Sequence, residues 1–349
     1  MERPRSHRPT GGANSLFNIT PVNSILRIGT RGSPLALYQA NAVAALLRDR
    51  VGTQSEIVAI KTSGDRLGEA PLSEVGGKRL FVKEIEDALL AGEVDLAVHS
   101  SKDMPALLPE GLAIAGVLPR EDPRDALVLP AGHDVEQDLD RIRLTLGATP
   151  RVGTSSVRRI AQLVSFSSGA QFLPVRGNLD TRLRKLDSGD FDALVLAAAG
   201  LRRLERGERI SAFLPVELCV PAPGQGIIAI EVRQSDDRAS AMIGTIGDPA
   251  AAVALKAERA VVDRLGGGCQ MPIGAFAHST NDGTLSITSI VVSTDGSRSV
   301  RATVQGSIRA PEQLGRQAAD ELLANGAERI LDDARRALGA PSATESHHS

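Results

Sequence analysis

Arginine side chains gather in one stretch of a chain whose overall charge is slightly negative. Residues 151–210 contain ten arginines and one lysine against four aspartates and two glutamates, whereas the 349-residue chain has a formal net charge of −2. In an open α/β sheet, the loops at the carboxyl ends of strands bind ligands. A guanidinium group there meets a carboxylate or phosphate with two hydrogen bonds. Five arginines stand where an apolar run gives way to a helical pattern and therefore predict an anion site: Arg158, Arg159, Arg176, Arg182 and Arg203.

The same stretch contains short polar side chains that add donors near predicted helix N-termini: Thr154, Ser155, Ser156 and Asn178. The free N–H groups and partial positive charge of a helix N-terminus favour an anion. Four further arginines are interpreted as solvated helix faces that pair with nearby acidic residues: Arg184, Arg202, Arg206 and Arg209. The pattern does not distinguish a carboxylate ligand from a phosphate.

A carboxylate follows the apolar run VDLAV in the segment HSSKDMP, residues 99–105. Asp103 stands beside Lys102 at a predicted strand end, where a lone aspartate is usually a turn or cap residue. A cationic surround favours another interpretation, because it keeps the carboxylate ionised and able to stabilise a cation that develops on a substrate. Asp103 is therefore a candidate catalytic residue, whereas His99 is interpreted as a hydrogen-bonded structural residue.

The two cysteines have contrasting surroundings. Cys219 lies between Leu218 and Val220 in a strand-like run and is interpreted as a small buried hydrophobe. Cys269 follows three glycines in GGGCQMPIGAFA, residues 266–277, and the glycine conformations leave its thiol uncovered. Because an exposed thiol in a positive environment becomes a nucleophile, Cys269 is a candidate reactive group.

A long, polar, glycine-rich segment, residues 61–81, precedes a predicted helix. Loops of this length in compact domains are usually active-site lids or disordered segments. A lid is the preferred interpretation, and a mobile surface loop is the alternative. The lid would close over an anion with four basic side chains: Lys61, Arg66, Lys78 and Arg79.

These residues need a scaffold, and the apolar pattern predicts an α/β one. Short apolar runs alternate with amphipathic stretches from Ile25 onward. Ser33 suits the N-cap and Pro34 the first position of the helix after the first strand. Two prolines and alternating charge at residues 119–126 indicate a boundary, and residues 214–233 are interpreted as a crossover that carries a strand.

The chain is therefore expected to form two α/β units and a small α+β C-terminal domain. The predicted bounds are 25–119 with 214–236 for the first lobe, 120–213 for the second lobe, 240–340 for the C-terminal domain, and 1–24 and 341–349 for disordered ends.

The composition restricts the class of protein. The fractions of 42% hydrophobic and 23% charged residues are those of an ordinary globular protein, and the net charge argues against a nucleic-acid-binding surface. Apolar runs stay shorter than a transmembrane helix, and the first 24 residues lack the apolar core of a signal peptide. Two cysteines are too few for a disulfide framework or a cysteine zinc site. We expect a cytoplasmic protein with no metal, membrane or nucleic-acid partner.

Taken together, the motifs resemble those of the porphobilinogen deaminase family, also called hydroxymethylbilane synthases. They occur in family order over roughly residues 25–280, with a looser match beyond, and only their combination is specific. The matching segments are RIGTRGSPLAL, GGKRLFVKEIEDALL, VDLAVHSSKDMP, REDPRDA, VGTSSVRR, RGNLDTRL, LAAAGLRRL, PAPGQG and AERAVVDRLGGGCQMPIGA. One departure is Arg79, which stands where a glycine usually follows GGK.

The resemblance implies that the two α/β units are lobes like those of periplasmic binding proteins, with the active-site cleft between them. It also implies a monomeric transferase with a dipyrromethane cofactor, held through a thioether to Cys269, and Asp103 as the catalytic carboxylate. It places Lys78 and Phe81 in a mobile lid. Carried over motif by motif, nine residues would bind the carboxylates of the cofactor and the substrate: Arg31, Ser33, Lys102, Ser156, Arg158, Arg159, Arg176, Arg182 and Arg203.

The implied reaction joins four porphobilinogen molecules head to tail with loss of ammonia, and releases hydroxymethylbilane for porphyrin and heme biosynthesis. Porphobilinogen carries two carboxylates, so several arginines suit a growing chain better than they suit one phosphate. Asp103 would stabilise cationic pyrrole species and relay a proton. The alternatives are a two-lobed solute-binding or ligand-sensing protein, against which the GGGC loop argues, and a phosphate-binding transferase, for which a GxxxxGK[ST] motif is missing.

Overall fold

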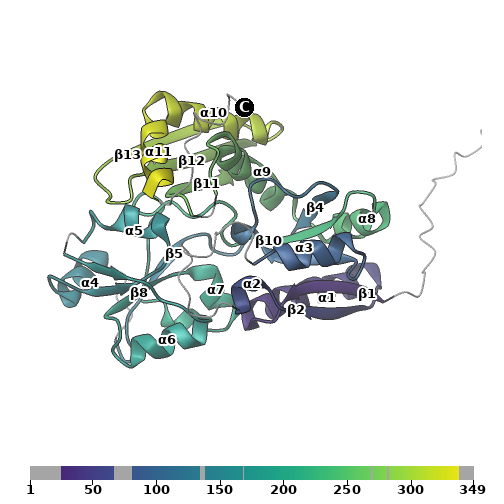
Figure 1. Cartoon of the computed structure of the whole chain (residues 1–349), viewed down its shortest axis with the longest axis horizontal. Helices are drawn as coiled ribbons and strands as arrows, with labels where there is room; N and C mark the ends of the chain where they lie inside the picture. Colours follow the sequence, from purple (N-terminus) through teal and green to yellow (C-terminus); the bar gives the residue numbers. More distant parts are fainter. Residues whose placement is uncertain are drawn as a thin grey trace, which may run out of the picture.

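The computed structural model describes residues 25–66, 81–133, 138–167, 169–268, 270–280 and 283–337. Its strands form two five-stranded sheets and one three-stranded sheet, each with its own helices. In Figure 1 the second sheet lies at the lower left, the first at the lower right and the C-terminal sheet above them. The predicted fold class, two α/β lobes with a small α+β domain, is confirmed. None of the described helices is long and apolar enough to cross a membrane.

The first sheet has the order β2-β1-β3-β10-β4, in which β1 runs parallel to β2 and β3, and β10 runs antiparallel to β3 and β4. Helix α8 packs on α1 and β4, so its residues share the core of this sheet. The elements are β1 (Leu26–Arg31), α1 (Pro34–Val51), β2 (Ser55–Ile60), α2 (Ser63–Arg66), α3 (Lys83–Leu90), β3 (Leu96–Ser100), the 3-10 turn η1 (Ser101–Asp103), β4 (Leu112–Val117), β10 (Ile228–Arg233) and α8 (Asp237–Ile246).

The second sheet has the order β7-β6-β8-β5-β9, again with three parallel strands and an antiparallel neighbour. The apolar residues of β8 alternate between cores on its two faces. The elements are β5 (Asp125–Val128), α4 (Leu139–Leu146), β6 (Arg151–Gly153), α5 (Val157–Leu163), β7 (Gln171–Leu173), α6 (Leu179–Asp187), β8 (Ala193–Ala197), α7 (Ala198–Arg203), η2 (Gly207–Arg209) and β9 (Ala212–Phe213).

The C-terminal sheet is antiparallel throughout, with the order β11-β12-β13, and its buried face packs on three helices. The elements are α9 (Pro249–Arg264), β11 (Ile273–Ser279), β12 (Thr284–Val292), β13 (Ser299–Ser307), α10 (Pro311–Ala324) and α11 (Ala327–Ala337).

Two segments cross between the first two sheets and pair with each other. Residues 118–124 lead from β4 to β5, and residues 214–227 lead from β9 back to β10. The Glu121 N–H donates to the Gly226 carbonyl at 3.0 Å. Gly226 has φ 86, and a Cβ there would lie 2.3 Å from the Glu121 carbonyl oxygen, so only glycine permits this approach. The crossover of residues 214–227 thus joins the two lobes closely beside the carboxyl ends of their parallel strands.

Candidate functional site

Asp103 lies at the end of η1, the turn that directly follows β3, and its side chain is exposed. It lines two cavities of the structure at once. We name them after the roles proposed for them below: the primer cavity also contacts Gly268, and the substrate cavity also contacts Arg31. A carboxylate that both cavities share is placed to act on groups bound in either one.

The primer cavity holds about 210 Å³, and its lining comes from η1, α5, the crossover of residues 214–227, α9 and the segment that leads into β11. Besides Asp103 it contains the predicted residue Lys102 and, more than fifty positions further along the chain, the predicted residues Ser156, Arg158 and Arg159. Gly268 and Met271 bring the glycine loop to the same cavity. Cys269, between them in the chain, lies outside the described residues, as do Lys78 and Arg79.

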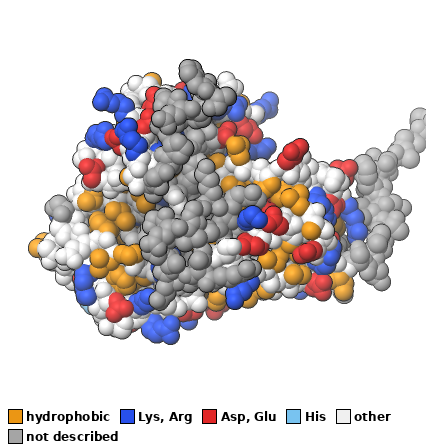
Figure 2. Space-filling view, viewed as in Figure 1, with side chains coloured by type: hydrophobic (Ala, Val, Ile, Leu, Met, Phe, Trp, Pro, Cys, Tyr) orange, Lys and Arg blue, Asp and Glu red, His pale blue; other side chains and the backbone are white. Residues whose placement is uncertain are grey.

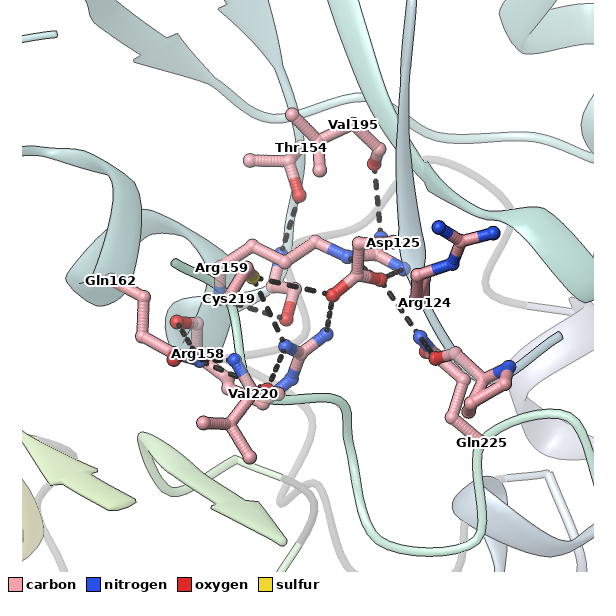
Figure 3. A network of polar contacts seen from close by, with 12 residues as sticks. Arg124, Asp125, Thr154, Arg158, Arg159, Gln162, Val195, Cys219, Val220 and Gln225 are labelled. Carbon is pink, nitrogen blue, oxygen red and sulfur yellow. Dashed lines mark hydrogen bonds and ion pairs between the residues drawn. The ribbon is translucent and has the colours of Figure 1, made fainter. Parts of the chain in front are cut away.

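Helix α5 presents the two arginines of this cavity. Ser156 is its N-cap, and the Ser156 hydroxyl accepts from the Arg159 N–H at 3.4 Å. Both arginines are buried and point toward Asp125, as Figure 3 shows. Asp125 accepts from Arg158 Nη2 at 2.7 Å and from Arg159 Nε at 2.9 Å. The neighbouring arginines hold the pKa of the Asp125 carboxyl well below its usual range despite complete burial, so Asp125 is ionised.

Protein groups do not satisfy every hydrogen-bond donor around the Arg158–Arg159 pair. Arg158 Nη1 donates to the Val220 carbonyl at 2.6 Å, whereas the buried Arg158 Nε has no partner among the described residues. The buried Ser101 hydroxyl, another group of the primer cavity, also has no partner in that part of the chain. Unpaired donors beside a cationic cavity fit an anionic, oxygen-rich group such as a carboxylated dipyrromethane.

Lys102 adds a third cation to the primer cavity. Its Nζ lies 3.4 Å from the Gln225 side-chain oxygen, and Gln225 belongs to the crossover of residues 214–227. Burial lowers the pKa of Lys102 to about 8, and the nearby carboxylates of Asp103 and Asp125 counteract this effect. The Lys102 side chain is therefore mostly protonated at neutral pH and loses its proton in moderately alkaline solution.

The substrate cavity lies between β1, α1 and the start of α3. Ser33 is the N-cap of α1, as predicted, and accepts from the Ala36 N–H at 3.3 Å. The Arg31 guanidinium lies 4.3 Å from the centre of the Phe81 ring and forms an ion pair with Asp65 at 2.5 Å. The buried Gln39 side-chain nitrogen, which has no partner among the residues described, completes the donors of this cavity.

Three of the predicted arginines stand apart from the described lining of both cavities. Arg182 lies close enough to Arg159, Arg176 and Asp103 to feel their charges, and burial lowers its pKa to about 10. Arg203 is buried and donates to the Gly226 carbonyl at 2.6 Å, so it contacts the crossover. Arg176 is half-buried after β7.

The residues that the sequence analysis interpreted as structural or solvent-exposed have the expected surroundings. Cys219 is buried, and burial raises the pKa of its thiol to about 12. His99 is within 3.2 Å of the buried Glu231 carboxylate. Three of the arginines interpreted as solvated faces form ion pairs with acidic partners, Arg202 with Glu121, Arg206 with Asp180 and Arg209 with Asp187.

The sequence patterns missed three residues of this region. Asp125 stood inside the quoted REDPRDA motif without a role, although a carboxylate directly before the apolar run ALVL is itself unusual. Gln225, in PAPGQG, and Arg259, on α9, line the primer cavity. Arg259 donates to the Ala106 carbonyl at 2.6 Å. Helical spacing could not show that this side chain of the C-terminal domain reaches a cavity of the first two lobes.

The positive charge of the site is local. On the face shown in Figure 2, basic and acidic side chains are interspersed over the described part of the surface. The arginines of the primer cavity lie inside, where the lower dielectric strengthens their attraction for an anion.

Comparisons with known proteins agree with this geometry. The family model "Porphobilinogen deaminase, dipyromethane cofactor binding domain" matches residues 26–241, and "Porphobilinogen deaminase, C-terminal domain" matches residues 252–324. A porphobilinogen deaminase of Syntrophotalea carbinolica is 47% identical over 310 residues, which cover 88% of this chain and 96% of the relative. That of Geobacter metallireducens is 47% identical over 307 residues, which cover 88% and 93%.

Solved structures include a more distant likeness. A probable amino-acid ABC transporter extracellular-binding protein of Bacillus subtilis is 10% identical, with a TM-score of 0.38, over 63% of this chain and 89% of that one. The family matches, in contrast, cover most of the chain and confirm the resemblance. The chain belongs to the porphobilinogen deaminase (hydroxymethylbilane synthase) family, transferases of porphyrin and heme biosynthesis that carry a dipyrromethane cofactor.

Proposed function

We propose that this chain performs the family reaction where its two cavities meet, with Asp103 as the catalytic carboxylate and Cys269 as the attachment point of the cofactor. The observation that carries the proposal is that Asp103 lines both cavities. The primer cavity is beside the glycine loop that contains Cys269, and the substrate cavity is lined by Arg31 and Ser33. A bond formed between a group held in each cavity would therefore form next to this carboxylate.

The residues of the primer cavity would hold the dipyrromethane. When bound, this group supplies a free pyrrole α-carbon from which the chain is extended. Lys102, Arg158 and Arg159 bind its acetate and propionate groups, and Ser156 adds a hydroxyl. Attachment at Cys269 needs a thiolate, which positive charge favours. The buried Cys219, with its raised pKa, stays a thiol at neutral pH.

Asp103 acts on the substrate through its charge and its proton affinity. Loss of ammonia from porphobilinogen leaves positive charge on the pyrrole ring, and an adjacent carboxylate stabilises it. The same carboxylate accepts or returns a proton at the reacting position. Lys102 and Arg182 both lie close enough to Asp103 to feel its charge, so the carboxylate works inside a cationic surround.

The substrate cavity, at about 40 Å³, is too small for a pyrrole with two carboxylate arms. We propose that the cavity enlarges when the Arg31 side chain leaves Asp65 and pairs with a substrate carboxylate. The Phe81 ring, stacked on Arg31, moves with it. We propose that Phe81 and Lys78 belong to the lid, and that Ser33 donates a hydrogen bond to the substrate.

The remaining predicted arginines extend the anion site. Arg182 keeps its charge at neutral pH, since its pKa of about 10 lies well above 7. We propose that Arg176 and Arg182 receive carboxylates of the growing chain, and that Arg203 does so after release from the Gly226 carbonyl.

The division into domains is proposed with one change. Packing of α8 on α1 and β4 favours a first domain of residues 25–119 and 214–246, which extends beyond the predicted end at 236. The second is 120–213 and the third runs from about 247 to 340. We further propose a monomer, because the most exposed large hydrophobic residues lie on different elements, and a cytoplasmic location, where the Cys269 thiol stays reduced. Light scattering and cell fractionation test both.

The catalytic assignment is tested by steady-state turnover. Purified chain supplied with porphobilinogen should release four ammonia molecules for each hydroxymethylbilane. Asp103→Asn should lower kcat by about 100- to 10,000-fold, the usual contribution of a positioned acid–base group. The matched control is Asp192→Asn, which removes an aspartate–arginine pair at the amino ends of β6 and β8, away from both cavities. Wild-type turnover by Asp103→Asn would remove Asp103 from the reaction.

A further inference from the structure

A buried carboxylate outside the predicted site residues holds both arginines of the primer cavity. Asp125 begins β5 and has no exposed surface. One of its oxygens accepts from Arg158 Nη2 at 2.7 Å, and the other accepts from Arg159 Nε at 2.9 Å and lies 2.8 Å from Arg159 Nη2. Each carboxylate oxygen thus fixes the orientation of one guanidinium group, as Figure 3 shows.

Asp125 also neutralises half of the positive charge of the Arg158–Arg159 pair. Two guanidinium groups side by side in a buried site repel each other, and removing one partner of such a network is strongly unfavourable. With Asp125 ionised, the three groups carry one net positive charge. Asp125 itself is not part of the described lining of either cavity, so it acts on a bound anion only through the arginines.

One amide joins this carboxylate to the first lobe. The Gln225 side-chain nitrogen donates to Asp125 at 2.9 Å and to the Pro123 carbonyl at 2.7 Å. Its side-chain oxygen lies 3.4 Å from Lys102 Nζ, and Gln225 is only 1% exposed. Because Lys102 is adjacent to Asp103, a single side chain links the arginine pair to the segment that bears the catalytic carboxylate.

We propose that Asp125 is a positioning residue for the reaction: it holds Arg158 and Arg159 ready for the anionic pyrrole chain and, through Gln225, aligns them with the Lys102–Asp103 segment. This inference rests on the function proposed above. It assigns to Asp125 a kinetic effect, and not only the stabilisation that any buried ion pair contributes.

A pH signature separates these two roles. The charged groups that act on Lys102 are Asp103, Asp125, Arg158 and Arg159. Asp125 is one of the two that raise the pKa of Lys102, so Asp125→Asn should move that pKa below about 8. If carboxylate binding requires protonated Lys102, the alkaline fall of kcat/KM then begins at a lower pH than in the wild type.

The experiment compares the full-length, primed enzyme with Asp125→Asn and Asp192→Asn, assayed well below the melting temperature of each. Asp192 accepts from Arg151 with two oxygens in the same lobe, but at the amino ends of β6 and β8, whereas Asp125 pairs with Ala197 at the carboxyl end of β8. We expect Asp125→Asn to lower kcat/KM by at least about 100-fold, with its alkaline limb displaced downward. Asp192→Asn should stay within about 3-fold of the wild type.

The outcomes decide between the claims. Wild-type enzyme that never turns over porphobilinogen would overturn the proposed function. An active wild type with an Asp125→Asn variant of unchanged kcat/KM and pH profile would overturn the inference alone. If Asp125→Asn does not fold, Gln225→Leu takes its place, because it keeps all the charges and removes the link together with the hydrogen bond to the Pro123 carbonyl. It should lower kcat/KM about 10-fold, and wild-type kinetics would refute the coupling.

Discussion

An ion pair between the first crossing segment and the C-terminal domain provides a sharp test of how the three domains are held together. Glu258 on α9 has no exposed surface, and the Arg120 side chain is only 12% exposed. The carboxylate of Glu258 accepts from Arg120 at 2.5 Å, from the Gly224 N–H at 2.6 Å and from the Ala277 N–H at 2.7 Å. One carboxylate therefore binds both crossing segments to β11.

Arg120→Leu leaves that carboxylate buried with its two backbone donors alone. Breaking one side of a buried pair costs about 3–5 kcal/mol of unfolding free energy. The two remaining N–H groups satisfy part of the charge, so the lower end of that range is expected. At about 2–4 °C per kcal/mol, the value for cooperative units of 150–250 residues, a loss of about 3 kcal/mol lowers the melting temperature by about 6–12 °C.

Scanning calorimetry measures the effect directly. The control is Arg264→Leu, since the Arg264–Asp320 pair joins side chains that are 49% and 55% exposed. An exposed pair contributes about 0–1 kcal/mol, so this variant should melt within about 4 °C of the wild type. Equal melting temperatures for the Arg120 and Arg264 variants would refute the argument that burial makes the first pair important.

Three further outcomes follow from the site. The wild-type kcat/KM should fall at alkaline pH with a midpoint near 8, because the lowered pKa of Lys102 lets this side chain lose its proton there. Lys102→Arg should move this alkaline fall to higher pH, and an unchanged pH profile would exclude Lys102 as its cause. Arg159→Leu should lower kcat/KM at least about 100-fold in steady-state assays by leaving carboxylates unpaired, and normal kinetics would place Arg159 outside the site. Ser33→Ala should cost about 1 kcal/mol in denaturant unfolding through loss of the α1 N-cap, and an unchanged midpoint would contradict this.

Local signals predicted much of the fold. The Ser33–Pro34 start of α1 depends on capping chemistry that neighbouring residues determine, and the structure has it. Strand β11 and helices α4, α8 and α11 were not identified. The sequence of β11, IGAFAHS, is short and interrupted by Gly274, and it becomes a strand because β12 offers it a long antiparallel ladder. That partner comes later in the chain, so tertiary pairing outweighs local propensity.

In the candidate site, too, local signals predicted some residues, whereas others depend on contacts between distant parts of the chain. Loop-end positions were sufficient to indicate Arg158, Arg159 and Asp103, since strand ends follow from the apolar pattern. The pairing of Asp125 with the arginines spans more than thirty residues, and no spacing rule connects them. Similarly, Gln225 joins the lobes only because two crossing segments run together.

The central claim is a covalent pyrrole primer on Cys269, and intact-mass measurement tests it most directly. Native chain that has been supplied with porphobilinogen should carry the added mass of two linked pyrrole units, and the digest should locate it on the peptide that contains Cys269. Cys269→Ala should show the bare chain mass, whereas the matched control Cys219→Ala should still carry the adduct, because that buried thiol is not the nucleophile. A native chain of bare mass, or an adduct that persists in Cys269→Ala, would contradict the account.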